Sequence, residues 1–263
     1  MSNNNQVKVA INYYSKLIGR ILRNEDCFSK GFSNVKINEE VSNFNCALVH
    51  AAIRPIKIAV TGSPFDYIVD SLNSCDEIYI PAFTPSFRNS GVYVSHLSRP
   101  EVGAFSNTAF SKNFYRTSDP VHSLFCSKKV KDIFVMNDTF HPDGVFKKFV
   151  EQGSCWINFG TPYLVSTVFH YIERYCNVPY LEKDLLKGSV FYQGSFHEIH
   201  HTSYKYNRKI VWNRKKIERD LIFHGCLKKT NVDGFVFRIV DGHSAFNFFK
   251  SELMKDPYYM VSP

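Results

Sequence analysis

Four short apolar segments, separated by stretches of helical or loop character, constrain the fold of this chain most. They lie at residues 47–49, 77–80, 133–136 and 156–159. Short apolar runs of this kind are typical of buried strands, and strands that alternate with helices pack into an α/β sheet. A chain of 263 residues with 44% hydrophobic content can bury one substantial core. We therefore expect a single α/β domain over residues 1–263.

The two ends of the chain add elements to this core. Apolar residues at helical spacing predict an amphipathic helix over residues 7–22. Residues 191–206 and 209–212 alternate like antiparallel strands, residues 234–240 indicate a further strand, and residues 244–254 indicate a last helix. The predicted fold is a mixed central sheet with flanking helices and an antiparallel hairpin in the C-terminal third.

Composition narrows the setting of the protein. No run of about 18 apolar residues is present to span a bilayer, and the polar start lacks the features of a signal peptide. The seven cysteines are an odd number, widely scattered and without a C-x-x-C pair, which favours reduced thiols over disulfides or a metal centre. We expect a cytoplasmic protein with no membrane partner and no metal.

Net charge favours anionic partners, because 32 Lys and Arg residues outnumber 24 Asp and Glu residues, for a net charge of +8. The densest basic patch covers residues 205–219, with Tyr204, Tyr206 and Trp212 interleaved. We interpret it as a solvated hairpin face, with phosphate contact as the alternative. The long segment 81–123, rich in Ser, Asn, Pro and Phe, is expected to be a functional loop.

Residues His197 to His201 match the H-E-x-x-H pattern of zinc proteases. That chemistry needs a helix, which brings the two histidines onto one face one turn apart. The flanking sequence favours a strand, on which the two residues would lie about 13 Å apart, too far to share one zinc ion. A zinc protease is therefore disfavoured.

The most informative segment is a predicted strand at 156–159, a glycine, and a predicted helix with His170 and Glu173 on one side. Ser166 or a neighbour can cap this helix, and its apolar stripe consists of Val168, Phe169, Ile172, Tyr175 and Cys176. Side chains at i and i+3 are neighbours on a helix. A carboxylate bound to one imidazole nitrogen leaves the other free to accept a proton, so the pair can act as a general base with its orienting group.

This segment resembles the aminoglycoside 3-N-acetyltransferase family, in which a glycine precedes an Asn-Thr-x-x-His-x-x-Glu pattern. Gly160, Thr167, His170 and Glu173 match it. Four further blocks, in the order of the family, are similar: Leu48-Val49-His50-Ala51-Ala52, Ile80-Pro81-Ala82-Phe83-Thr84, Val102-Gly103-Ala104-Phe105-Ser106 and Arg116-Thr117-Ser118-Asp119-Pro120-Val121-His122-Ser123. The resemblance covers residues 45–176.

The resemblance implies an acetyl-coenzyme A donor, an amine acceptor and direct attack of the amine on the thioester, with His170 as the base and Glu173 as its partner. By the same resemblance, the coenzyme would contact Arg116, Thr117, His122, Ser123, Ala51 and Ala52. The acceptor would contact Phe83, Thr84 and Thr167. Transfer of a different acyl group, or transfer to a hydroxyl, stays open.

Three departures from the family bear on the acceptor. Ser166 replaces the usual Asn, Tyr163-Leu164-Val165 stands where drug-modifying members often carry His and Asn, and Asp119 replaces a His. A basic chain suits an anionic acceptor better than a polycationic drug. The sequence is most similar to the family's members from surface-polysaccharide biosynthesis, so we expect a nucleotide-linked amino sugar as the acceptor. The alternatives are an aminoglycoside acetyltransferase and a non-catalytic protein that binds a glycan or nucleic acid; a homo-oligomer is compatible with either.

Overall fold

The computed structural model describes residues 32–112, 114–128, 137–192 and 194–262. The predicted helix at 7–22 and the predicted strand at 133–136 lie outside these residues. Among the described helices, none has both the length and the apolar character needed to cross a bilayer.

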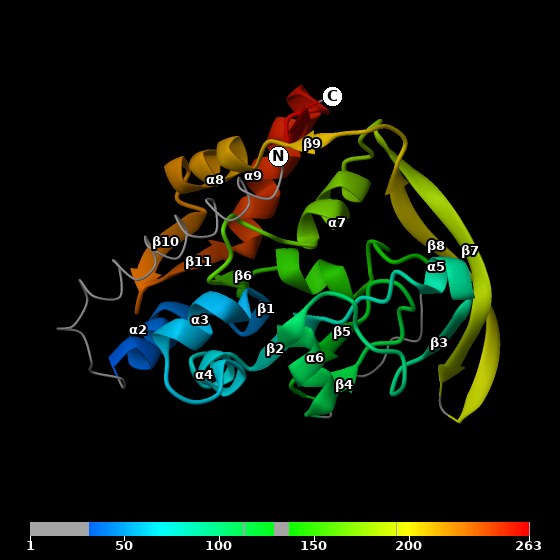
Figure 1. Ribbon diagram of the computed structural model, residues 1–263. Coiled ribbons are helices and arrows are strands. Elements are labelled where there is room, and N and C mark those ends of the chain that lie inside the picture. The colour runs from blue at the N-terminus through cyan, green and yellow to red at the C-terminus, as the bar shows by residue number, and fades with distance from the viewer. Residues whose placement is uncertain (1–31, 113, 129–136, 193, 263) are drawn as a thin grey trace, which may run out of the picture.

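A mixed seven-stranded sheet forms the centre of the molecule (Figure 1). Its middle strands β6, β1 and β2 run parallel, and the strands toward both edges are antiparallel. The middle strands are apolar on both faces, as a sheet covered by helices on both sides requires. In spatial order the sheet consists of β10 (Leu227–Val232), β11 (Phe235–Asp241), β6 (Ser154–Phe159), β1 (Cys46–Ala51), β2 (Glu77–Pro81), β5 (Leu124–Cys126) and β4 (Tyr115–Arg116). The predicted mixed α/β sheet is confirmed.

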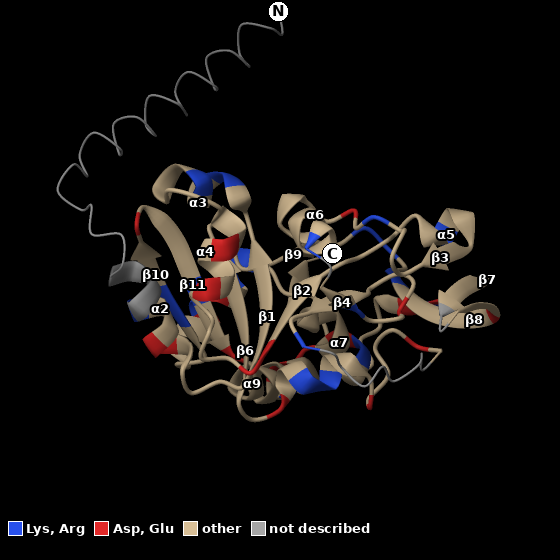
Figure 2. Ribbon diagram, turned by 90° about the horizontal axis from the view of Figure 1, so that it is seen from below, with Lys and Arg blue, Asp and Glu red and all other residues tan. Residues whose placement is uncertain are grey.

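Helices cover both faces of this sheet, as Figure 2 shows from below. One face packs against α3 (Ile53–Ala59), α4 (Pro64–Asp70) and α6 (Ala104–Ser111), and also contacts α2 (Phe32–Val41). The other face packs against the 3-10 helix η1 (Val145–Val150), α7 (Val168–Tyr175), α8 (Arg214–Phe223) and α9 (Gly242–Lys255). Strand β1 serves both layers, with Ala47 and Val49 in the first core and Leu48 in the second. The last helix matches the one predicted at 244–254.

A long hairpin extends from the body of the molecule at the far side from α8 (Figure 1). It consists of β7 (Leu181–Tyr192) and β8 (Ser195–Tyr206), and β3 (Val92–Val94) pairs with β7 as a third strand. The antiparallel hairpin in the C-terminal third is confirmed. The predicted strand segment 191–206 contains the end of β7 as well as β8, and the partner of β8 is the preceding segment, whose mixed polar sequence does not alternate clearly.

The basic segment is also arranged differently from the prediction. Strand β9 (Val211–Trp212) pairs with the C-terminal β12 (Val261–Ser262), and residues 214–223 form helix α8, so the basic patch is not a hairpin face. The segment 81–123 is not one extended loop, because it contains α5 (Phe87–Ser90), β3, α6 and β4. Short elements of two to eight residues leave little periodicity to read in a sequence.

The chain leaves β1 and β6 toward opposite faces of the sheet, into α3 and α7 respectively. Gly160 makes the turn after β6 with φ of +65°, and a Cβ there would lie 3.1 Å from the carbonyl oxygen of Ala52. Glycine is therefore required both for the left-handed conformation and for the close approach of the two strand ends. Adjacent parallel strands that diverge in this way open a crevice at their carboxyl ends, where open α/β sheets bind ligands.

Candidate functional site

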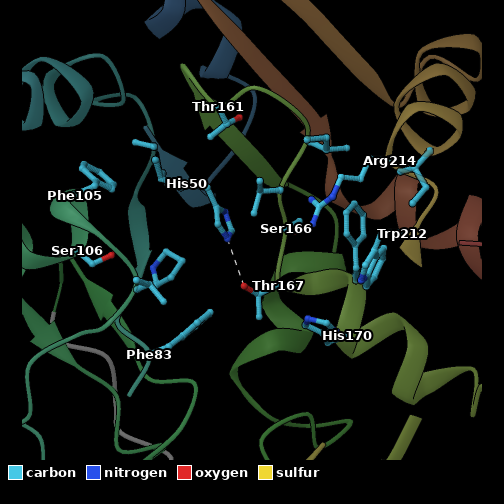
Figure 3. Close-up of a pocket in the computed structure, with 18 residues that line it drawn as sticks. His50, Phe83, Phe105, Ser106, Thr161, Ser166, Thr167, His170, Trp212 and Arg214 are labelled. Carbon is cyan, nitrogen blue, oxygen red and sulfur yellow. Dashed lines mark hydrogen bonds between the residues drawn. The ribbon is translucent and has the colours of Figure 1, made fainter. Parts of the chain in front are cut away.

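A pocket of about 410 Å³ lies at this crevice (Figure 3). Its wall comes from the ends of β1 and β2, from α6, from the loop between β6 and α7, and from the start of α7 and α8. The lining residues are Val49, His50, Ala51, Pro81, Phe83, Val102, Phe105, Ser106, Thr161, Leu164, Val165, Ser166, Thr167, Phe169, His170, Trp212, Arg214 and Ile217. The volume falls within the range of small-molecule sites, and the lining is mostly apolar with a few polar groups, as such sites usually are.

The predicted pair sits at one end of this pocket. Nδ1 of His170 lies 3.1 Å from Oε2 of Glu173, and the Glu173 side chain is fully buried whereas that of His170 is 32% exposed. Nε2 of His170 has no hydrogen-bond partner among the described residues. The carboxylate thus holds one ring nitrogen and leaves the other available to a ligand, which is the arrangement that a general base needs.

Hydrogen bonds from two buried polar side chains fix the loop that leads into α7. The side-chain oxygen of Asn158, at the end of β6, accepts from the backbone N–H of Val165 at 2.7 Å and from the Thr161 hydroxyl at 3.0 Å, and its amide nitrogen donates to the Val165 carbonyl at 2.9 Å. The buried guanidinium of Arg238 donates to the Thr161 carbonyl at 2.8 Å and pairs with Glu218 at 3.1 Å. Because the loop lacks regular structure, these contacts satisfy its backbone groups and hold its pocket-lining residues in place.

His50, at the end of β1, faces the same loop across the pocket. Its Nε2 lies 3.4 Å from Oγ1 of Thr167, as the dashed line in Figure 3 marks, and its Nδ1 is buried without a partner among the described residues. Burial lowers the pKa of His50 to about 4, so this imidazole is neutral at pH 7. A neutral imidazole with an unused nitrogen can donate to, or accept from, a polar group of a ligand.

The predicted coenzyme residues of the 116–123 turn contact the protein itself. Arg116 donates from Nε to the Ser123 hydroxyl at 3.1 Å and from its terminal nitrogens to the carbonyls of Ser95, Ser98 and Ala82. The Ser123 hydroxyl in turn donates to the Ala82 carbonyl at 2.8 Å. Burial lowers the pKa of Arg116, although the guanidinium remains charged. This side chain therefore ties two loops to the end of β2.

The other members of this turn have similar contacts. The Thr117 hydroxyl accepts from the backbone N–H of Leu124 at 2.8 Å, and the Thr84 hydroxyl donates to the Pro120 carbonyl at 2.7 Å. The ring of His122 packs edge-on against Phe83 at 4.9 Å between centroids. Burial lowers the pKa of His122 to about 3, against the opposing charge of Asp119, so it too is neutral at pH 7.

The structure thus divides the predicted site residues into two groups. Ala51, Phe83, Thr167 and His170 line the pocket, with Glu173 directly behind the histidine. Ala52, Thr84, Arg116, Thr117, His122 and Ser123 do not line it. Their assignment to coenzyme or acceptor stays a prediction.

Most of the pocket lining was not predicted as part of the site, and two of these residues, one aromatic and one basic, lie in the basic and aromatic segment. The Trp212 ring lies 5.7 Å from that of His170, and the guanidinium of Arg214 lies 4.1 Å from the centroid of the Tyr163 ring. Arg214 has no acidic partner among the described residues, whereas Lys205, Lys216 and Arg219 in the same segment are paired with carboxylates. The aromatic residues beside the basic ones were the signal, but periodicity could not indicate which would face the pocket.

The H-E-x-x-H segment belongs to β8, as the sequence predicted. His201 is buried, with Nε2 2.8 Å from the Thr139 hydroxyl, whereas His197 is exposed. In the described parts of the chain, no group of three His, Cys, Asp or Glu side chains is arranged to hold a metal ion.

No protein-family model and no curated protein matches the chain, but solved structures do. The YokD protein from Bacillus subtilis matches with a TM-score of 0.66 and 14% identity over 85% of this chain and 94% of that one. Aminoglycoside acetyltransferase AAC(3)-Xa matches with a TM-score of 0.67 and 12% identity over 85% and 93%. AAC-IIIb in its binary complex with CoASH matches with a TM-score of 0.66 and 15% identity over 85% and 95%. The chain has the fold of the aminoglycoside acetyltransferases, which confirms the predicted resemblance at the level of fold.

Proposed function

We propose that this protein transfers an acetyl group from acetyl-coenzyme A to the amine of an amino sugar, with His170 as the general base. The observation that carries the proposal is the His170–Glu173 pair, with Nδ1 3.1 Å from a buried carboxylate and the ring at the pocket wall. The shared fold with aminoglycoside acetyltransferases, one of them solved with CoASH, supports the donor and the reaction class.

The base is needed because an ammonium group has no lone pair and cannot attack a carbonyl. His170 accepts one proton of the ammonium group at Nε2, which frees the nitrogen lone pair to attack the thioester carbonyl. The C–S bond then breaks as the C–N bond is completed, and the second proton of the nitrogen passes to the departing thiolate. The products are an amide and the free coenzyme thiol. Glu173 stabilises the imidazolium during this transfer by its charge and its hydrogen bond to Nδ1.

The pocket residues are suited to hold the narrow thioester arm of the coenzyme, which supplies the activated acetyl group. The wall near β1 and β2 is apolar, formed by Val49, Ala51, Pro81 and Phe105, and the neutral His50 offers one polar group within it. Such a lining excludes water, which would otherwise compete with the amine for the thioester.

For the acceptor, we propose an amino sugar that carries an anionic group, such as a nucleotide-linked sugar of surface-polysaccharide biosynthesis. None of the described residues that line the pocket is acidic, and Arg214 is its only permanently charged side chain. An unpaired guanidinium binds phosphate or carboxylate with two parallel hydrogen bonds, and Trp212 offers a flat apolar surface to a sugar ring.

The second candidate acceptor is an aminoglycoside, and the names of the structural neighbours favour it. A polycationic drug would gain from carboxylates at the pocket, which the described lining lacks. Comparing the two acceptor classes directly therefore decides between them.

The decisive experiment is a thiol-release assay with acetyl-coenzyme A and a panel of acceptors, comprising nucleotide-linked amino sugars, amino-sugar phosphates, their neutral counterparts and aminoglycosides. We expect turnover with the anionic sugars. Turnover confined to aminoglycosides would support the second candidate instead. Release with no acceptor of the panel, together with no binding of acetyl-coenzyme A at millimolar concentration by calorimetry, would contradict the enzyme proposal and leave a binding protein.

A further inference from the structure

A third side chain contacts both members of the His170–Glu173 pair. The hydroxyl of Tyr206 lies 3.0 Å from Nδ1 of His170 and 3.2 Å from Oε2 of Glu173. With the 3.1 Å contact between His170 and Glu173, the three groups form a closed triangle. Tyr206 is the last residue of β8, so the hairpin reaches the candidate site through this one side chain.

The end of β8 is held against α7 by contacts that fix the position of Tyr206. The Tyr204 hydroxyl donates to Asp138 at 3.0 Å and accepts from Nε of Arg174 at 3.1 Å, and Arg174 also pairs with Asp138 at 3.3 Å. Tyr204 shares a face of the strand with Tyr206, and Arg174 follows Glu173 on the helix. Beyond the strand, the backbone N–H of Asn207 donates to the Tyr180 carbonyl at 3.1 Å. These contacts therefore hold the end of β8 in one position against α7.

The buried carboxylate of Glu173 needs these donors. It is fully buried, and His170 is its only potential cationic partner among the described residues. Burial and the charge of Glu173 both raise the pKa of Tyr206, so the phenol keeps its proton and donates it to the carboxylate. The phenol oxygen can then accept a hydrogen bond from Nδ1–H of His170. This N–H is shared between the oxygens of Tyr206 and Glu173.

We propose that Tyr206 is a positioning residue for the transfer reaction, which holds His170 in the tautomer with the proton on Nδ1 and donates a hydrogen bond to the Glu173 carboxylate. The inference rests on the proposed role of His170 as the base. It assigns the hairpin a part in the reaction, since β8 carries the hydroxyl that completes the site.

The test is Tyr206→Phe, which keeps the ring that packs 5.8 Å from His170. We expect kcat to fall about tenfold with the KM values of both substrates within about twofold. The matched control is Tyr171→Phe, which removes a tyrosine hydroxyl from α7, the helix that carries His170, where it is bonded at 3.1 Å to the Pro142 carbonyl. The control should keep both kcat and the KM values.

Unchanged kcat in folded Tyr206→Phe would overturn the proposal, as would an equal loss in Tyr171→Phe. A second measurement does not depend on the folding of Tyr206→Phe: nitrogen-15 NMR of the histidine rings of the unaltered protein, with His170 assigned from the signal lost in His170→Gln. We expect neutral His170 to carry its proton on Nδ1, and a proton on Nε2 would contradict the proposal. This readout does not depend on turnover, so it is separate from a failure of the proposed transfer reaction.

Discussion

The helix that carries His170 and the turn at 116–123 resemble the same family, yet their side chains are used differently. The His170 ring lines the pocket with one nitrogen unpartnered, whereas the Arg116 guanidinium donates to four oxygens of the protein. A motif match therefore indicates which residues come together, but not which of their donors remain available to a ligand. Substitutions in the helix should lower turnover, and substitutions in the turn should lower stability, so the two kinds of loss can be measured separately.

The largest effect is expected for His170→Ala. Removing the base should lower kcat by about two to four orders of magnitude, with the dissociation constant of acetyl-coenzyme A nearly unchanged, because the imidazole acts on the amine. Steady-state kinetics and calorimetry measure the two quantities. The exposed His200 on β8 provides the control, and His200→Ala should behave like the unaltered protein. Turnover within about threefold of normal in His170→Ala would remove this residue from the mechanism.

The opposite outcome is expected for Arg116→Ala. Its loss removes the donor to the carbonyls of Ser95 and Ser98 and leaves the Ala82 carbonyl with the Ser123 hydroxyl alone, so the free energy of unfolding should fall by about 2–4 kcal/mol. Denaturant unfolding measures this change, and acetyl-coenzyme A affinity should change little in the folded fraction. If instead stability is retained and coenzyme affinity falls tenfold or more, Arg116 has the coenzyme role that the resemblance implies.

A smaller effect is expected for Arg214→Ala on the pocket rim. If its guanidinium binds the anionic group of the acceptor, the KM for an amino-sugar phosphate should rise about tenfold, with little change for the neutral sugar. The control is Arg219→Ala, on the same helix but paired with Asp220. A rise in the KM for acetyl-coenzyme A alone would assign Arg214 to the coenzyme. If the KM of every substrate is unchanged from that of the unaltered protein, Arg214 has no binding role.

The last expected effect concerns the acid dependence of stability. The folded protein holds His122 neutral to about pH 3 and His50 to about pH 4, whereas the unfolded chain protonates both below their ordinary pKa of 6.5. The unfolded state thus binds more protons as the pH falls from 6.5 to 4, and the free energy of unfolding decreases by up to about 1.4 kcal/mol per pH unit for each residue. Denaturant titrations of His122→Gln should give a shallower decrease, and an identical slope would contradict this assignment.

Local patterns predicted much of the fold and the centre of the site. The apolar runs at β1, β2 and β6 are buried strands, because a run with no polar face must be covered on both sides. The His170–Glu173 contact followed from helical spacing alone, since residues three apart on a helix are neighbours wherever the helix lies. Gly160, with its positive φ and its contact with Ala52, likewise stands at the turn that the sequence predicted.

Only the tertiary structure decided which distant residues join this pair. Tyr206 reaches His170 across 36 positions of sequence and His50 reaches Thr167 across 117. The first contact depends on how β8 packs against α7, and the second on the pairing of β1 with β6. The pairing of β9 with β12 and the start of α8 bring Trp212 and Arg214 to the pocket. The sequence by itself determined that His170 and Glu173 are in contact, because their geometry is local. The groups proposed to orient His170 and to bind the acceptor were set by packing, because no periodicity in the chain records where two separate segments meet.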